Sequence, residues 1–279
     1  MILFIYSTSG WSYKLLTRIY LISHNIFRIM EIIILGSGTF SPSLTRTSSG
    51  LIIKIKNDPI LFDCGSGIYF KLAHAGVDFH DIANIFCTHY EHPDHIHDLP
   101  FLIFAKKYDK RELKKDLLIG GPQGFKKFFN TFNGLYSILK EVPFKLIFKE
   151  LKNDTFVAND FSITTKPMLH GNTKCIGYRI EAEGKSVVYS GDTDYCENIV
   201  SLAKNADVLI AECSFPDELK VQNHLTPSLA GKIASEAEVK TLVLTHLFPE
   251  CDKFNIKKQA KKIFKGKVIV AKDFMRVKV

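Results

Sequence analysis

The chain has 279 residues, 46% of them hydrophobic, which is enough for one large globular domain with a substantial core. The formal net charge of +8 favours an anionic partner, such as nucleic acid or a phosphate ester, without defining the fold. Six scattered cysteines without a C-x-x-C pair argue against a zinc ribbon and a disulfide scaffold, and predict a reduced cytoplasmic protein.

The first 29 residues differ from the rest of the chain. They are apolar and aromatic, but four basic side chains interrupt them: Lys14, Arg18, His24 and Arg28. No stretch is therefore long and uncharged enough to span a bilayer, and the pattern of a secretory signal is missing. We predict that translation begins at Met30, that residues 1–29 are an N-terminal extension, and that residues 30–279 form a single domain. An amphipathic leader that associates with membranes is the minority interpretation.

From Glu31 onward, apolar runs of strand length alternate with turn residues. In the first half we predict strands at 31–35, 51–56, 60–62, 84–88 and 117–120. The turn residues 57–59 indicate a hairpin between the second and third of these strands. Helical periodicity occurs in residues 67–75 and 94–106.

The second half also alternates apolar runs with turn residues, but its sequence does not repeat that of the first half. We predict strands at 144–151, 160–165, 175–181, 185–190, 208–212, 241–245 and 267–271, and helices at 197–206, 227–237 and 255–265. Several links are too short for a parallel crossover, which favours antiparallel pairing. Two half-sheets, each followed by helices, predict a sandwich of sheets with helices outside. We interpret the seven lysines between 253 and 267 as the solvated face of a helix rather than as a contact for an anionic partner.

The strongest local signal lies in residues 88–98, where four histidines and three acidic residues follow a short apolar strand. Neutral imidazole and carboxylate are ordinary ligands of zinc and similar metals, and a strand-to-helix turn can direct several of them to one point. A polar surface turn with helix-capping residues is the alternative, but it explains so dense a cluster less well.

Further candidate ligands stand at the ends of other predicted strands. His170 precedes Gly171, Asp192 follows an apolar run, and His246 follows the strand 241–245. Burial of a carboxylate or imidazole there is unfavourable unless the group is paired or bound to a metal. Each residue alone is explained equally well as a cap or core residue, but three matching placements favour a shared site.

The order Asp63-Cys64-Gly65, then His89, His92, Asp94 and His95, then His170, Asp192 and His246, resembles the metallo-β-lactamase fold hydrolases. The resemblance covers nearly all of the chain from Met30 onward. Within that superfamily the chain is most similar to the ribonuclease Z branch. The supporting features are LGSGT at 35–39, DLP at 98–100, GGPQG at 120–124, Glu212, and HLT at 224–226.

This resemblance implies an α/β fold, namely an αββα sandwich of two mostly antiparallel or mixed sheets with outer helices. It also implies two metal ions, with zinc as the default and Mn²⁺ or Fe²⁺ as alternatives. One ion would be bound by His89, His92 and His170, and the other by Asp94, His95 and His246. Asp192 would bridge the two ions, and Asp63 would support the site through hydrogen bonds.

The spacing of the first two histidines departs from the family pattern His-x-His-x-Asp-His. His89 and His92 are three positions apart, so counting back from Asp94 puts the first ligand on Tyr90. We expect a one-residue bulge that keeps His89 in the site. Glu91 as a substitute oxygen ligand is the second alternative, and loss of the first metal position is the third.

The implied reaction is attack of a metal-activated hydroxide on phosphorus. By family analogy, Asp94 would accept a proton from the attacking water. Glu212 and His224 are the candidates to protonate the leaving alkoxide, because a carboxylate can hold a nearby imidazole protonated and oriented. The competing interpretation of His224 is a polar residue that simply precedes a helix.

Substrate specificity is less well defined. Many ribonuclease Z enzymes carry a flexible arm between the third and fourth motifs that clamps transfer RNA, but here His170 and Asp192 are only 22 positions apart (192 − 170). This leaves no room for an arm. Four basic residues could contact an RNA backbone instead: Lys106, Lys107, Lys110 and Arg111. The alternative interpretation of these residues is a solvated helix end.

Three hypotheses follow. The first is a ribonuclease Z-like phosphodiesterase that acts on RNA, including tRNA, or on a smaller phosphodiester. The second is a hydrolase of another ester class, such as a lactone, thioester or sulfate ester, and the third is a non-catalytic binding relative. We expect no membrane partner, and the family resemblance suggests a homodimer.

Overall fold

The structure is a computed structural model that describes residues 30–111, 115–135, 141–158 and 160–279. The predicted extension, residues 1–29, lies outside the described residues, so the start at Met30 stays a prediction. The assignment of residues 30–279 to one domain also stays a prediction. Among the described residues, no helix combines the length and the apolar character that a membrane crossing requires.

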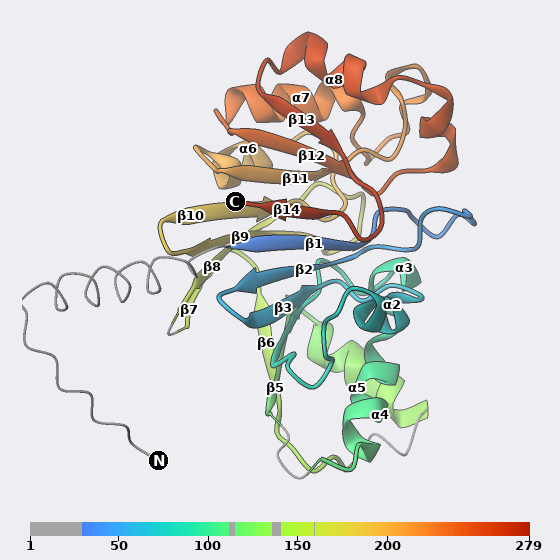
Figure 1. Ribbon diagram of the computed structural model, residues 1–279, viewed down its shortest axis with the longest axis vertical. Coiled ribbons are helices and arrows are strands. Elements are labelled where there is room, and N and C mark those ends of the chain that lie inside the picture. The colour runs from blue at the N-terminus through green and yellow to red at the C-terminus, as the bar shows by residue number, and fades with distance from the viewer. Residues whose placement is uncertain (1–29, 112–114, 136–140, 159) are drawn as a thin grey trace, which may run out of the picture.

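The first of two sheets has seven strands in the order β14-β1-β2-β3-β4-β5-β6 (Figure 1). Pairing is antiparallel from β14 to β3 and parallel from β3 to β6. The predicted hairpin between β2 and β3 is confirmed, with its turn at Lys56 and Asn57. The strands are β1 Glu31–Gly36, β2 Gly50–Ile55, β3 Asp58–Phe62, β4 Asn84–Phe86, β5 Leu117–Pro122, β6 Leu146–Leu151 and β14 Arg276–Lys278.

The second sheet has the order β13-β12-β11-β10-β9-β8-β7 and the same division. Its strands pair antiparallel from β7 to β10 and parallel from β10 to β13. The strands are β7 Thr155–Val157, β8 Ser162–Pro167, β9 Ile176–Ala182, β10 Lys185–Tyr189, β11 Val208–Glu212, β12 Thr241–Thr245 and β13 Lys267–Val270. The prediction was two mostly antiparallel or mixed sheets; both sheets are mixed, with three antiparallel and three parallel pairings in each.

Helices cover the outer face of each sheet (Figure 1). Beside the first sheet lie α2 Ile68–His74, α3 Pro93–Ile96, α4 Leu99–Tyr108 and α5 Phe125–Leu135. Beside the second lie α6 Glu197–Ala203, α7 Pro227–Glu236 and α8 Ile256–Ile263. Short 3₁₀ helices occur at η2 Asp217–Leu219 and η3 Pro249–Lys253. The predicted αββα sandwich is therefore confirmed.

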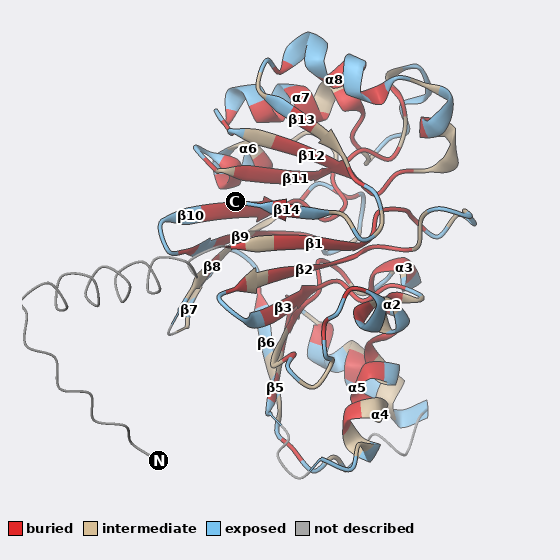
Figure 2. Ribbon diagram, viewed as in Figure 1, coloured by how far each residue is buried: buried red, intermediate tan, exposed pale blue. Residues whose placement is uncertain are grey.

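Burial explains why the strands read as continuous apolar runs. In β1, Ile32 and Ile34 point into the core between the two sheets, whereas Ile33 and Leu35 point into the core under the helices. Alternate side chains of a strand face opposite sides, and here both sides are covered (Figure 2). The inner layer consists of buried hydrophobic side chains from both sheets, and it holds the sheets together through hydrophobic burial.

The structure differs from the predicted elements in several places. The single helix predicted at 94–106 is wrong, because the chain forms α3 and α4 with a break at His97 and Asp98. Pro100 accounts for this, since its ring would clash with the carbonyl of Ile96 in a continuous helix. The elements α5, β7 and β14 were not predicted from the sequence.

Candidate metal centre

The candidate ligands follow strands whose carboxyl ends meet at one edge of the sandwich. Asp63 directly follows β3, and His89 lies three residues beyond β4. On the second sheet, His170 lies three residues beyond β8, Asp192 three residues beyond β10, and His246 directly follows β12. Because β3 and β4 are parallel, as are β10 to β12, these strand ends project their polar residues toward the same region.

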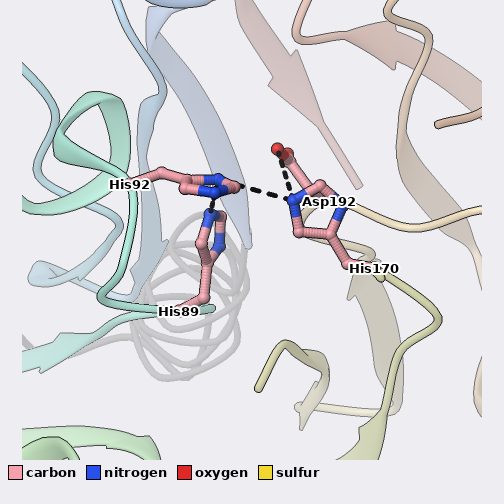
Figure 3. A group of neighbouring side chains, drawn as sticks. All are labelled: His89, His92, His170 and Asp192. Atoms are coloured by element: carbon pink, nitrogen blue, oxygen red, sulfur yellow. Dashed lines mark hydrogen bonds and ion pairs between the residues drawn. The ribbon is translucent and has the colours of Figure 1, made fainter. Parts of the chain in front are cut away.

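A first group of four residues offers one ligand atom each, all within 4.8 Å of one another: His89, His92, His170 and Asp192. His89 Nε2 lies 3.1 Å from His92 Nδ1, which lies 3.4 Å from His170 Nε2. Asp192 Oδ2 is 3.9 Å from His170 Nε2. Figure 3 shows the rings of His89 and His92 meeting at one point, with His170 and Asp192 facing them.

The unusual spacing therefore leaves His89 inside the cluster. The neighbouring Tyr90 is directed away, because its ring stacks on Phe128 at 5.0 Å. Glu91 is exposed, and its carboxylate accepts a hydrogen bond from the backbone N–H of Tyr90. The extra residue is thus accommodated in the loop after β4, as expected for the bulge that keeps His89 among the candidate ligands.

A second group contains Asp94, His95 and His246, all buried and again within 4.8 Å. His95 Nε2 and His246 Nε2 are 3.3 Å apart, and Asp94 Oδ2 is 3.5 Å from His246 Nε2. Asp192 Oδ1 completes this group at 3.3 Å from His95 Nε2 and 3.5 Å from His246 Nε2. The two carboxylate oxygens of Asp192 therefore face different groups.

Hydrogen bonds on the far side of the rings determine which nitrogen faces the centre. His170 Nδ1 donates to the carbonyl of Asn223, which can only accept, so Nε2 keeps its lone pair. His95 Nδ1 likewise donates to Asp63 Oδ2 at 2.8 Å. His246 Nδ1 donates to Ser214 Oγ at 3.0 Å, because the Ser214 hydroxyl itself donates to Glu212. Such outer hydrogen bonds fix the tautomer of metal-binding histidines.

Asp63 anchors this outer layer and is fully buried. Its carboxylate accepts hydrogen bonds from the backbone N–H and hydroxyl of Thr88, from the Tyr189 hydroxyl and from His95 Nδ1. Since the Thr88 hydroxyl donates to Asp63, it accepts from His89 Nδ1 at 3.1 Å. Asp63 thus orients one histidine of each group, one directly and one through Thr88.

The donor set fits a divalent cation. Asp192 Oδ1 is buried and has no hydrogen-bond partner among the described residues, although a buried carboxylate oxygen normally has one. Burial lowers the pKa of His89 and of His92, which favours the neutral imidazole that binds metals. The pKa of Asp192 is well below its ordinary value, because the attraction of His246 and His95 outweighs burial.

The electrostatics around His95 also favour a bound cation. Burial lowers the pKa of this imidazole, but the neighbouring carboxylates of Asp192 and Asp63 outweigh burial and raise it well above its ordinary value. The carboxylates therefore attract positive charge to this point, as a proton or as a cation, and metal ions compete with protons for such sites. The residues present fit bound divalent metal.

Glu212 and His224 form a hydrogen-bonded pair at the side of the second group. His224 Nδ1 lies 3.0 Å from Glu212 Oε1, and its ring is 6.0 Å from the ring of His246. Burial lowers the pKa of His224, but the hydrogen bond with Glu212 outweighs burial and raises it. The Glu212 carboxylate is held by backbone N–H groups of Thr193, Ser214 and Leu225.

The four basic residues predicted to contact substrate lie at the end of α4 and beyond it. Lys106 is only 2% exposed, and its ammonium donates to the carbonyls of Phe79, His80 and Ile82, so it does not face a substrate. Burial lowers its pKa to about 8. Arg111 forms ion pairs with Asp78 and Asp109, and Lys110 is exposed. Lys107 lies with its ammonium 5.4 Å from the centre of the Tyr108 ring.

The residues that orient the candidate ligands were not predicted from the sequence: Thr88, Tyr189, Ser214 and Asn223. Three of them are adjacent to residues that were singled out or to strand ends, but hydroxyl and amide residues are common in such turns. Asn223 contributes only its backbone carbonyl, for which the side chain carries no signal. These partners are defined by contacts between segments far apart in the chain.

Comparisons with known proteins agree with this geometry. Ribonuclease Z from Methanosarcina mazei is 29% identical over an alignment of 307 positions, which covers 90% of this chain and 98% of that protein. Ribonuclease Z from Bacillus velezensis is 28% identical, with 90% and 99% coverage. Among solved structures, the metallo-beta-lactamase fold protein YhfI from Bacillus subtilis has a TM-score of 0.78 and 29% identity, covering 90% of this chain and all of that one.

Human tRNase Z, short form, is also similar, with a TM-score of 0.74, 25% identity and coverage of 89% of this chain and 98% of that chain. Residues 59–247 match the beta-lactamase superfamily domain, a span that includes all seven candidate metal ligands. The chain therefore belongs to the beta-lactamase superfamily, as a metallo-β-lactamase fold hydrolase similar to ribonuclease Z.

Proposed function

We propose that this protein hydrolyses phosphodiester bonds, in RNA or in a smaller diester, with two divalent metal ions. The observation that carries the proposal is the position of Asp192, whose Oδ2 faces the group of His170 and whose Oδ1 faces His95 and His246. A carboxylate shared by two ligand sets is suited to the paired ions that phosphatases and nucleases use. Zinc is the proposed metal, because imidazole and carboxylate ligands suit it, and Mn²⁺ or Fe²⁺ are the alternatives.

Bound divalent cations supply an acidified water molecule and offset the negative charge of a phosphoryl group. The chain's own residues supply the proton transfers. Asp94, within the second group, accepts a proton from the attacking water. The Glu212 carboxylate holds the Nδ1 proton of His224, which leaves Nε2 to donate a proton to the leaving oxygen. The raised pKa of His224 favours the protonated form that this step needs.

The proposed substrate range includes small diesters because the chain lacks an arm between His170 and Asp192. The hairpin of β9 and β10 occupies that interval. The alignment with the Methanosarcina mazei enzyme has 307 positions and covers 90% of this chain, about 251 residues, so about 56 positions (307 − 251) have no counterpart here. A precursor tRNA would therefore need a different docking surface, for which the exposed Lys110 is one basic candidate among the described residues.

The experiment combines metal analysis with two substrates. Metal-free protein is loaded with Zn²⁺, Mn²⁺ or Fe²⁺, the bound ions are counted, and hydrolysis of bis(p-nitrophenyl) phosphate and of a precursor tRNA is measured. We expect two ions per chain and hydrolysis of the small diester. Asp192→Asn should lose both. The matched control is Asp207→Asn, because Asp207 is a carboxylate that accepts hydrogen bonds from Ser186 and Lys240 outside the site.

A second variant separates proton donation from metal binding. His224→Ala should keep both ions and lose most of the turnover, since general acid catalysis contributes about 10²–10⁴-fold. Loss of a metal ion in this variant would contradict the division of roles. Hydrolysis of a lactone, thioester or sulfate ester without any phosphodiester cleavage would show that the proposed reaction is wrong.

Two further features belong to the proposal. We place the protein in the cytoplasm because all six cysteines, among the residues described, are free thiols. We also propose a homodimer, on the family resemblance, and sedimentation of the purified protein tests it.

A further inference from the structure

Three phenylalanines near the candidate metal centre belong to none of the hydrophobic cores formed by the described residues: Phe40, Phe215 and Phe248. Phe40 is the most exposed of them, at 73%. Single exposed apolar side chains are common and need no explanation. Three aromatic rings that contact one another beside a candidate active site are a different case.

The three rings form a continuous series that starts in solvent and ends at the site. Phe40 meets Phe248 edge-on at 5.4 Å, and Phe248 stacks on Phe215 at 4.5 Å with an interplanar angle of 19°. Phe215 lies 6.4 Å from the ring of His224, and Phe248 lies 6.3 Å from the ring of His246. The series therefore borders the side of the site where His224 stands.

Hydrogen bonds between the three loops fix the backbone that carries these rings. Phe248 N donates to the carbonyl of Ser214, directly before Phe215. Leu247 N donates to the carbonyl of Ser37, in the loop that carries Phe40. Asp273 holds that loop by accepting hydrogen bonds from the backbone N–H and hydroxyl of Ser37. The rings are therefore positioned before a ligand arrives, which limits the entropy lost on binding.

We propose that Phe40, Phe215 and Phe248 form a stacking subsite for the nucleobase on the leaving-group side of a phosphodiester substrate. This inference rests on the proposed function, in which His224 protonates the leaving oxygen. Cations held by the two ligand groups would bind the phosphate, and the adjacent apolar rings would bind a planar group. The two surfaces together therefore match a nucleotide. Stacking accepts any base, because every base presents a π face.

The test compares two ligands that share a sugar phosphate and differ in the base. Adenosine 5′-monophosphate and ribose 5-phosphate are titrated into the zinc-loaded, full-length protein by equilibrium dialysis. Stacking on aromatic side chains predicts that the nucleotide binds about 5- to 150-fold more tightly. Equal affinities, or no binding of either ligand at millimolar concentration, would overturn the subsite.

Variants assign the difference to the rings. Phe40→Ala should weaken nucleotide binding at least about 5-fold and leave ribose 5-phosphate binding unchanged, and Phe40→Trp should restore the preference. Phe70→Ala is the matched control, because Phe70 is 64% exposed on α2 and contacts the rings of Tyr69 and Phe101 instead. Equal weakening of both ligands by Phe40→Ala would indicate a role in loop structure and would refute the proposal.

The failure of this inference is distinguishable from failure of the proposed function. If the wild-type protein hydrolyses bis(p-nitrophenyl) phosphate but shows no preference for the nucleotide, the phosphodiesterase proposal stands and the stacking subsite is wrong. If the metal-loaded protein hydrolyses no phosphodiester at all, the proposed function itself is wrong, whatever the ligands bind.

Discussion

Replacement of Asp63 by asparagine removes the acceptor that orients both halves of the candidate metal centre. Asp63 Oδ1 accepts from Thr88 N at 2.8 Å, while Oδ2 accepts from His95 Nδ1 and from the Tyr189 hydroxyl, each at 2.8 Å. An asparagine side chain has one acceptor oxygen and one NH₂ group. Whichever way the amide is turned, its NH₂ group faces at least one buried donor.

The expected magnitude follows from these contacts. A buried donor left without an acceptor destabilises the fold by about 1–3 kcal/mol. In a domain of this size, each kcal/mol lowers Tm by about 2–4 °C. If the asparagine NH₂ instead donates to His95 Nδ1, the His95 proton moves to Nε2, the nitrogen that faces Asp192 and His246. Metal affinity at the second group should then fall about 10- to 100-fold.

The assay is a competitive titration of Zn²⁺ against a chelator of known affinity, with thermal unfolding measured on the same samples. Asp63→Asn should weaken the ion at Asp94, His95 and His246 more than the ion at the first group. Asp207→Asn, which changes a carboxylate outside the site, should leave both affinities unchanged. A well-folded Asp63→Asn protein with two wild-type affinities would refute the reasoning that links Asp63 to the metal centre.

Three other predictions follow from the structure. Gly65→Ala should reduce metal binding and stability, because a Cβ there would lie 2.0 Å from the carbonyl oxygen of Asp94. The control is Gly134→Ala, where the Cβ meets open space; it should leave the stability measured by urea titration unchanged or slightly increased. The pKa of Lys106 is about 8 when folded and about 10.4 when unfolded, so the unfolded state binds more protons between these values. The stability of the wild type relative to Lys106→Met should therefore rise from pH 8 to pH 10, and a flat difference would contradict the buried ammonium. Asp273→Asn should speed hydrogen exchange in residues 36–49, and unchanged exchange would show that Asp273 does not hold this loop.

The sequence predicted most of the strands, because a strand buried on both faces needs an unbroken apolar run, as in β1 and β12. It also predicted the candidate ligands, because the dense cluster at residues 88–98 and the matching placements of His170, Asp192 and His246 after other apolar runs favour a shared site, although each of the three alone could be a cap or core residue. The elements that it missed depend on distant partners. β14 has three residues and forms only by pairing with β1, about 240 positions earlier.

Tertiary structure determined the parts of the site that depend on the direction in which side chains point. The spacing of His89 and His92 left three alternatives open, and the choice depends on how the loop after β4 turns, with Tyr90 packed on Phe128. In the sequence, nothing distinguishes Lys106 from the neighbouring basic residues, yet its ammonium donates hydrogen bonds to three backbone carbonyls. Residue type and spacing are local properties of the chain. The direction of a side chain, and the nitrogen that an imidazole presents, are set by partners such as Asp63 and Ser214 that only folding brings near.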